Sequence, residues 1–210
     1  MQLKRALAAM VLLPALVPAL AACATGGDEP SVPDSNPGFF ARALGGDDEP
    51  NAGPCPLMGA LYETSRVVQF QDPTVQRYAN IAFTGEMQGV RGLCRYVGEA
   101  PIVMSIEVDM AFGRGPAAQA NEHTYTYWVA VARRGSGLPL AKQYYTVDVR
   151  FPNGEDVMAT TQTIEGIVIP RANADISGEN FEVLVGFELT DEQLAFNRDG
   201  RRFRVNAPEG

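Results

Sequence analysis

The chain has 210 residues, of which 46% are hydrophobic, and carries 17 lysines and arginines against 25 aspartates and glutamates. This length and apolar content predict one globular domain with a substantial core, preceded by shorter segments. The formal net charge of −8 argues against nucleic acid as a partner, because phosphate contacts require lysine and arginine.

Residues 1–22 have the layout of a secretory signal. Lys4 and Arg5 form a positive start, residues 6–20 are almost wholly apolar, and small residues surround Cys23. The apolar run is short for a membrane span and two prolines interrupt it, so a transmembrane anchor is the weaker alternative. Removal of residues 1–22 takes away two basic and no acidic side chains, which leaves 15 against 25 and a net charge of −10.

The end of this run, Leu20-Ala21-Ala22-Cys23, resembles the lipobox of bacterial lipoprotein precursors. In that family the cysteine thiol receives a diacylglyceryl group, and cleavage frees an amine that is usually acylated too. The resemblance implies a lipidated Cys23 and a stable anchor, since several acyl chains hold a protein on a membrane. Ala24 rather than aspartate follows, which in that family favours the outer membrane, facing the periplasm. Ordinary signal cleavage after Ala21 is the alternative.

The cysteine count is consistent with this interpretation. An exported protein with three cysteines, at positions 23, 55 and 94, has one thiol too many for disulfides alone. Assigning Cys23 to lipid leaves Cys55 and Cys94, which an oxidising compartment would allow to bond. Two buried free thiols are the alternative.

Residues 23–54 are predicted to be a lipidated cysteine followed by a disordered acidic tether rich in proline and glycine. Phe39-Phe40 interrupts the tether and is expected to dock on the domain or on a partner. Asp47-Asp48-Glu49 would attract calcium, but a tether offers no rigid cage, so no metal site is assigned.

Residues 55–207 show the period of two that is typical of strands. The clearest is residues 102–112, whose even-numbered side chains are apolar while Ser105, Glu107 and Asp109 lie on the other face. A bend or bulge is expected at Gly85, Gly89 and Gly92. The sequence Pro152-Asn153-Gly154 predicts a tight turn whose flanking strands pair as a hairpin. Further strands are expected near residues 67–70, 79–84, 93–97, 124–131, 145–151, 158–169 and 181–189.

Thr190-Asp191-Glu192-Gln193 predicts a capping box and a short helix to about Arg198. Seven or eight short strands with little helix predict an all-β antiparallel sandwich, Ig-like in general architecture, with one short C-terminal helix. A partly closed barrel is the alternative architecture.

No catalytic motif is evident. His123 is the single histidine, and the sequence contains no Gly-x-Ser-x-Gly motif that would supply a nucleophile for it. Glu107 and Asp109 form the most obvious carboxylate pair for a glycan hydrolase, yet charges on the wet face of a sheet are usually solubilising. We therefore expect a noncatalytic protein without a cofactor.

The aromatic residues Tyr125, Tyr127, Trp128 and Tyr144 are the candidate ligand-binding residues. An exposed row of them would bind glycan or an extended peptide, whereas packing within the sheet or core is the alternative. The sequence thus predicts a membrane-tethered cell-envelope lipoprotein whose β-domain has an interaction or structural role. Its expected partners are the membrane, through the lipid, and envelope proteins or glycan. A glycan- or peptide-binding module and a carboxylate-based hydrolase are the alternatives.

Overall fold

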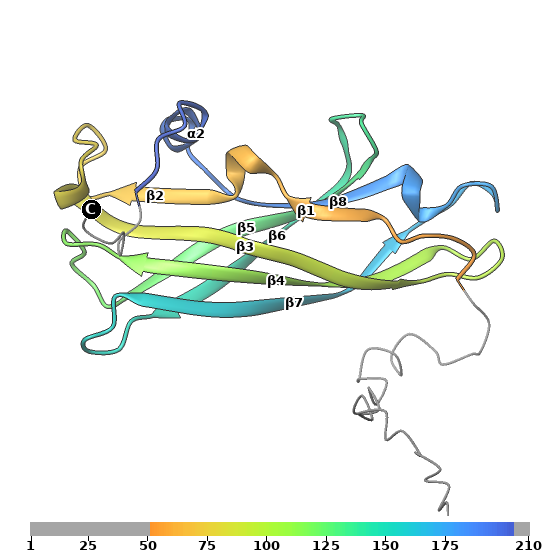
Figure 1. Ribbon diagram of the computed structural model, residues 1–210, viewed down its shortest axis with the longest axis horizontal. Helices are drawn as coiled ribbons and strands as arrows, with labels where there is room; N and C mark the ends of the chain where they lie inside the picture. The colour runs from red at the N-terminus through yellow and green to blue at the C-terminus, as the bar shows by residue number, and fades with distance from the viewer. Residues whose placement is uncertain (1–50, 204–210) are drawn as a thin grey trace, which may run out of the picture. The chain divides into compact units, whose positions relative to one another are not determined.

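A computed structural model describes residues 51–203, which form two packed four-stranded sheets and a short C-terminal helix (Figure 1). The predicted all-β sandwich with one helix is confirmed. Three single turns of 3-10 helix, η1 (Tyr62–Thr64), η2 (Tyr78–Asn80) and η3 (Gly178–Asn180), connect the elements. The strands and helix are β1 (Leu57–Ala60), β2 (Arg66–Phe70), β3 (Ile81–Arg95), β4 (Ile102–Arg114), β5 (Glu122–Arg133), β6 (Pro139–Arg150), β7 (Val157–Ile169), β8 (Phe181–Phe187) and α2 (Asp191–Arg198).

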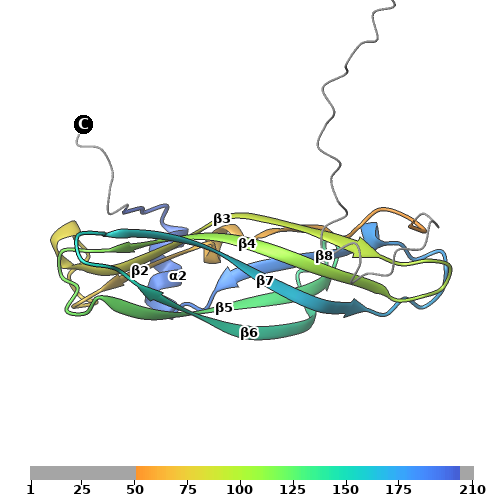
Figure 2. The same cartoon turned by 90° about the horizontal axis from the view of Figure 1, so that it is seen from below.

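The first sheet has the order β1-β8-β5-β6 and the second has the order β2-β3-β4-β7. Figure 2 shows β5 and β6 on one side of the sandwich and β3 and β4 on the other. Every pair is antiparallel except β1 with β8, which run parallel. Strands β6 and β7 therefore each end a sheet.

The core lies between the sheets and is built by side-chain alternation. The six even-numbered apolar residues of β4, from Ile102 to Phe112, are each at most 2% exposed. They face β5 and β8, where Val183 and Val185 are fully buried. Because side chains on a strand alternate between its faces, the sequence pattern of β4 predicted which of its side chains are buried.

The glycine-rich part of the second sheet differs from the prediction in one respect. A bend or bulge was expected between two short strands; β3 instead runs without interruption for 15 residues, and the irregularity is a register shift between Met87 and Gly89. A Cβ at Gly92 would lie 2.3 Å from the backbone oxygen of Ser105. Gly92 therefore permits a close approach of β4, and Gly89 marks the bulge.

The hairpin predicted across residues 152–154 is wrong, although the turn itself exists. Gly154 has a φ of 88°, and the amide of Glu155 donates to the oxygen of Pro152 at 3.0 Å. The chain crosses from one sheet to the other at this turn, so β6 pairs with β5 and β7 pairs with β4. A tight turn fixes the reversal of the chain, but the sheet each strand joins is decided by burial.

The predicted capping box at the start of α2 is confirmed. Thr190 Oγ1 accepts the amide of Gln193 at 3.3 Å, and Gln193 Oε1 accepts the amide of Thr190 at 2.9 Å. The helix buries Phe196 against Val68 and Ile81 on the outer face of the second sheet, forming a second, small core.

The predicted signal segment, the lipidated Cys23 and most of the predicted tether, including Phe39-Phe40 and Asp47-Asp48-Glu49, lie outside the described residues. Residues 204–207 of the predicted domain also lie outside them. Within residues 51–203, no helix is long and apolar enough to cross a membrane.

Candidate functional site

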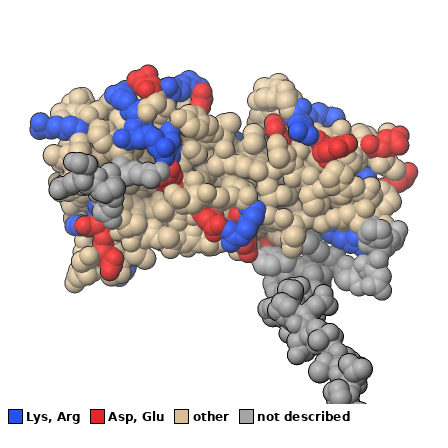
Figure 3. Space-filling view, viewed as in Figure 1, with Lys and Arg blue, Asp and Glu red and all other residues tan. Residues whose placement is uncertain are grey.

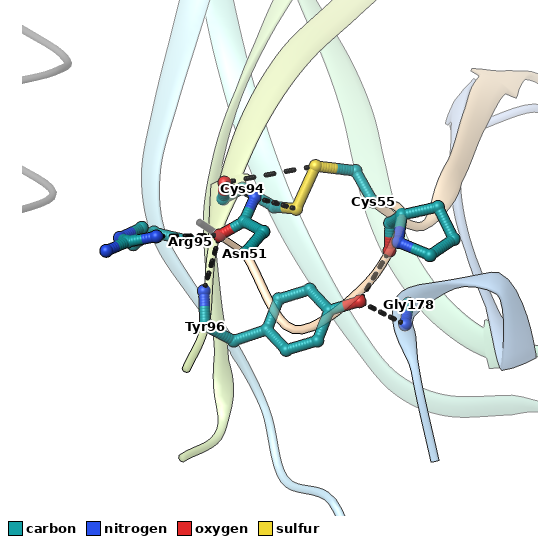
Figure 4. Close-up of a disulfide and its surroundings, with 7 residues drawn as sticks. Asn51, Cys55, Cys94, Arg95, Tyr96 and Gly178 are labelled. Carbon is teal, nitrogen blue, oxygen red and sulfur yellow. Dashed lines mark hydrogen bonds between the residues drawn. A yellow bond between two sulfur atoms is a disulfide. The ribbon is translucent and has the colours of Figure 1, made fainter. Parts of the chain in front are cut away.

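The predicted disulfide between Cys55 and Cys94 is present, with the two Cα atoms 5.6 Å apart (Figure 4). Cys94 lies near the end of β3 in the second sheet, and Cys55 lies two residues before β1 of the first. The bridge therefore ties the entrance of the domain to the opposite layer of the sandwich.

A set of hydrogen bonds around this bridge fixes residues 51–54, which the sequence placed in the tether (Figure 4). Asn51 Nδ2 donates to the oxygen of Cys94 at 3.0 Å, and Asn51 Oδ1 accepts the amide of Tyr96 at 3.0 Å. Tyr96 is 2% exposed. Its hydroxyl donates to the oxygen of Pro54 at 2.7 Å and accepts a hydrogen bond from the amide of Gly178 at 3.0 Å. The folded domain thus includes Asn51. Sequence reasoning missed Asn51 and Tyr96, since neither belongs to a motif.

The four candidate aromatic residues divide between the two faces of the first sheet. Tyr125 and Tyr127 point into the core and are 4% and 2% exposed. Tyr125 packs on Phe112 with ring centroids 4.4 Å apart, and its hydroxyl donates to the oxygen of Thr84 at 2.9 Å. Trp128 and Tyr144 are directly opposite each other on β5 and β6, on the outer face. The packing alternative thus describes Tyr125 and Tyr127.

On the outer face, Lys142 lies between the two aromatic rings. Its Nζ is 4.6 Å from the centre of the Trp128 ring and 4.7 Å from that of Tyr144. Trp128 is only 7% exposed, and its Nε1 donates to the oxygen of Phe187 at 3.1 Å. A cation over the ring face is favourable, and it occupies the surface on which a sugar would stack. Tyr144, half exposed, is the one candidate available to a ligand.

Strand β6 leaves an apolar edge exposed. Leu138, Leu140 and Tyr144 are 75%, 56% and 52% exposed. Within residues 51–203, β6 pairs with β5 alone, so its other edge presents backbone N–H and C=O groups without a strand partner. Edges of this kind accept an additional strand from another chain.

The carboxylate pair is held in a network of ion pairs and hydrogen bonds. Arg91 on β3 forms ion pairs with Glu107, at 2.7 Å, and with Asp109. Thr161 Oγ1 donates to Asp109 Oδ1 at 2.7 Å. Hydrogen bonds from Thr161 and Arg91 lower the pKa of Asp109, whereas a general acid requires a raised pKa. The contacts suit a cross-strand stabilising role.

His123 also has a packing role. Its ring stacks on Phe83 with centroids 4.5 Å apart and meets Tyr125 edge-on at 4.5 Å. Burial lowers its pKa. Within residues 51–203, no group of three or more histidine, cysteine, aspartate or glutamate side chains is arranged to hold a metal ion.

The buried tyrosines predict a loss of stability in alkali. Burial raises the pKa of Tyr127 from 10.0 to about 12. The folded state therefore favours the neutral phenol, so its contribution is complete below pH 10 and is lost as the pH rises through 12. This shift corresponds to about 2.7 kcal/mol at most. Urea unfolding between pH 9 and 12 should show a smaller fall for Tyr127→Phe than for the unchanged chain; identical curves would contradict the burial.

Comparison with protein-family models, with curated proteins and with solved structures gives no match for this chain.

Proposed function

We propose that this chain is a lipid-anchored protein of the bacterial cell envelope whose β-sandwich has a noncatalytic interaction role. The chain is exported, Cys23 carries the lipid, and the domain is held near the outer membrane by the segment before Asn51. The lipid provides the membrane contact, and the domain provides the contacts with envelope proteins.

The observation that carries the proposal is the Cys55–Cys94 bridge. A structural disulfide requires an oxidising compartment, which is typical of exported proteins. It also uses two of the three cysteines, so the remaining one is Cys23, directly after the apolar run and within the lipobox-like sequence. Compartment and leftover thiol thus support the same interpretation.

The interaction role is supported by the edge of β6. An extended peptide from a partner would add a strand beside β6 through main-chain hydrogen bonds, with Leu138, Leu140 and Tyr144 contacting alternate side chains. A row of aromatic rings for glycan has less support, since Lys142 occupies the space between Trp128 and Tyr144.

Cell fractionation tests the anchor. The full chain should remain in the membrane pellet after a high-salt wash, because acyl chains rather than charge retain it. Cys23→Ser should move to the soluble envelope fraction, whereas the double variant Cys55→Ala/Cys94→Ala should stay in the pellet. Equal retention of the full chain and Cys23→Ser would contradict the proposal.

A photo-crosslinking amino acid placed at Leu140 tests the interaction role. It should capture a defined envelope protein in living cells, and the adduct should disappear when Tyr144 is changed to glutamate, because a charge would disrupt the apolar contact. The matched control is the same probe at Val168, which is 57% exposed on β7 at the edge of the other sheet. An identical set of adducts from both positions would rule out β6 as the specific interface.

A further inference from the structure

Arg66 on β2 is buried although it carries a full positive charge. It is 8% exposed and lies on the outer face of the second sheet, below the C-terminal end of α2. Asn197 of that helix covers the strand here, since its Nδ2 donates to the backbone oxygens of Glu63 and Arg66, both at 2.8 Å. Of the Arg66 guanidinium nitrogens, Nε and Nη2 are shielded from solvent and have no hydrogen-bond partner within residues 51–203.

The free atoms form one complete edge of the guanidinium. Nε and Nη2 point their N–H groups in the same direction, and this two-donor edge matches the two oxygens of a carboxylate. The neighbouring Arg198 shows the same edge in use, because its Nε and Nη2 both donate to Glu63 Oε2, at 3.0 and 2.9 Å. The guanidinium of Arg66 also lies over the ring of Tyr62, with its carbon 5.0 Å from the ring centre.

The surrounding charges leave Arg66 uncompensated. Three other arginines lie at this end of the domain, and each has its own acid within the described residues. The pairs are Arg198 with Glu63 at 2.9 Å, Arg201 with Asp199 at 2.8 Å and Arg202 with Glu86 at 2.7 Å. Glu86 is directly opposite Arg66 on β3, but its carboxylate is paired with Arg202. Within residues 51–203, no anion accepts a hydrogen bond from Nε or Nη2 of Arg66, and a buried charge without a partner is costly.

Arg66 also lines a cavity of about 230 Å³ between the outer face of β2, β3 and β4 and the segment after α2. The polar lining residues are Thr84, Glu86, Gln88, Asn197, Arg201 and Arg202, and Phe203 contributes an apolar wall. The one acidic side chain among them, Glu86, is paired with Arg202 at 2.7 Å. Figure 3 shows Lys and Arg side chains gathered at the end of the domain that carries α2 and β2, with acidic side chains among them. The cavity has room for a small group and donors to hold it.

We propose that this cavity binds the carboxylate of a ligand, which accepts two hydrogen bonds from Nε and Nη2 of Arg66. A single negative charge completes the charge balance of the cluster. A phosphate dianion would bring a second charge, while Arg201 and Arg202 already have acid partners. The ligand class is a carboxylate-bearing molecule small enough, at its charged end, for about 230 Å³. This site goes beyond the proposed interaction at β6, which belongs to the other sheet, and it does not depend on lipidation of Cys23.

Acetate is the probe for this site. The full-length chain, purified in detergent and labelled with ¹⁵N-arginine, is titrated with sodium acetate at pH 7 while sodium chloride is lowered to keep the ionic strength constant. The Nε–H signal of Arg66, identified by its loss in Arg66→Lys, should move downfield and saturate. The Nε–H signal of Arg198 is the internal control, because Glu63 already fills its edge, and it should stay in place.

Thermal unfolding gives the second measurement. Acetate should raise the Tm of the unchanged chain and of the control Arg150→Lys, since Arg150 is an exposed partner of Glu122 on β6. The rise should be lost in Arg66→Lys, which keeps the charge but not the two-donor edge. Where Arg66→Lys does not fold, Arg66→Met serves for both the assignment and the Tm, because it removes the uncompensated charge.

Three results would overturn the inference. The first is an Arg66 signal that moves linearly with acetate, like those of surface arginines. The second is saturation by inorganic phosphate but not by acetate. The third is a signal already shifted downfield and insensitive to acetate, which would mean that a carboxylate of the chain itself, such as Glu209, occupies the edge. None of these results depends on the anchor, so the test of membrane retention succeeds or fails separately.

Discussion

Removing the disulfide, as Cys55→Ala/Cys94→Ala, is expected to lower the free energy of unfolding by about 4 kcal/mol. The bridge joins residues 39 apart in sequence, and opening a loop of this length increases the entropy of the unfolded chain. The change should also release residues 51–54, because Asn51 is held against the backbone beside Cys94. Urea unfolding followed by the fluorescence of Trp128 measures the difference.

Two controls accompany this measurement. Cys23→Ser should leave the midpoint unchanged, since Cys23 takes no part in the bridge, and a reducing agent should shift the midpoint of the unchanged chain toward that of the double variant. Equal midpoints with and without reducing agent would show that the bridge does not form in the purified protein.

Phe112→Ala is expected to cost about 3–5 kcal/mol, the range for a large buried aromatic residue. Phe112 is 2% exposed at the end of β4, and its ring lies 4.4 Å from that of Tyr125 and 6.3 Å from that of Phe187. Truncation would therefore leave a cavity between the two sheets. The free energy of unfolding in urea checks this effect.

The matched control is Leu93→Ala on β3. Leu93 is 53% exposed and belongs to the same sheet, so its loss should change the free energy of unfolding by about 0.5 kcal/mol or less. Comparable losses for the two variants would mean that the two sheets do not enclose the core described here.

The fold was predictable where one face of a strand is buried and the other is wet. The alternation along β4 indicated both its extent and its inner face. The structure shows the same alternation on β5, where Tyr125 and Tyr127 lie on one side and Trp128 on the other, whereas the prediction from the sequence had grouped these residues in one row. Such alternation has no information about which strands pair. For this reason the turn at Gly154 was predicted correctly while its hairpin was wrong.

The candidate sites also differ in how far they could be predicted from the sequence. The Cys55–Cys94 pair followed from a count of cysteines, which needs no geometry. The burial of Arg66 could not be predicted, because an arginine at the start of a short apolar strand usually lies at the surface. Its burial depends on Asn197, which is 131 residues away in sequence. Contacts over such distances arise only when the strands and α2 have packed.

The central claim is that Cys23 carries lipid after export. Cells that produce the unchanged chain are fed labelled palmitate, and the purified protein is analysed by gel and by intact mass. We expect label on the protein and the mass of a chain that begins at Cys23 with its acyl groups; Cys23→Ser should carry no label. An unlabelled wild-type chain, or one that begins at another residue with its Cys23 thiol free, would contradict the account.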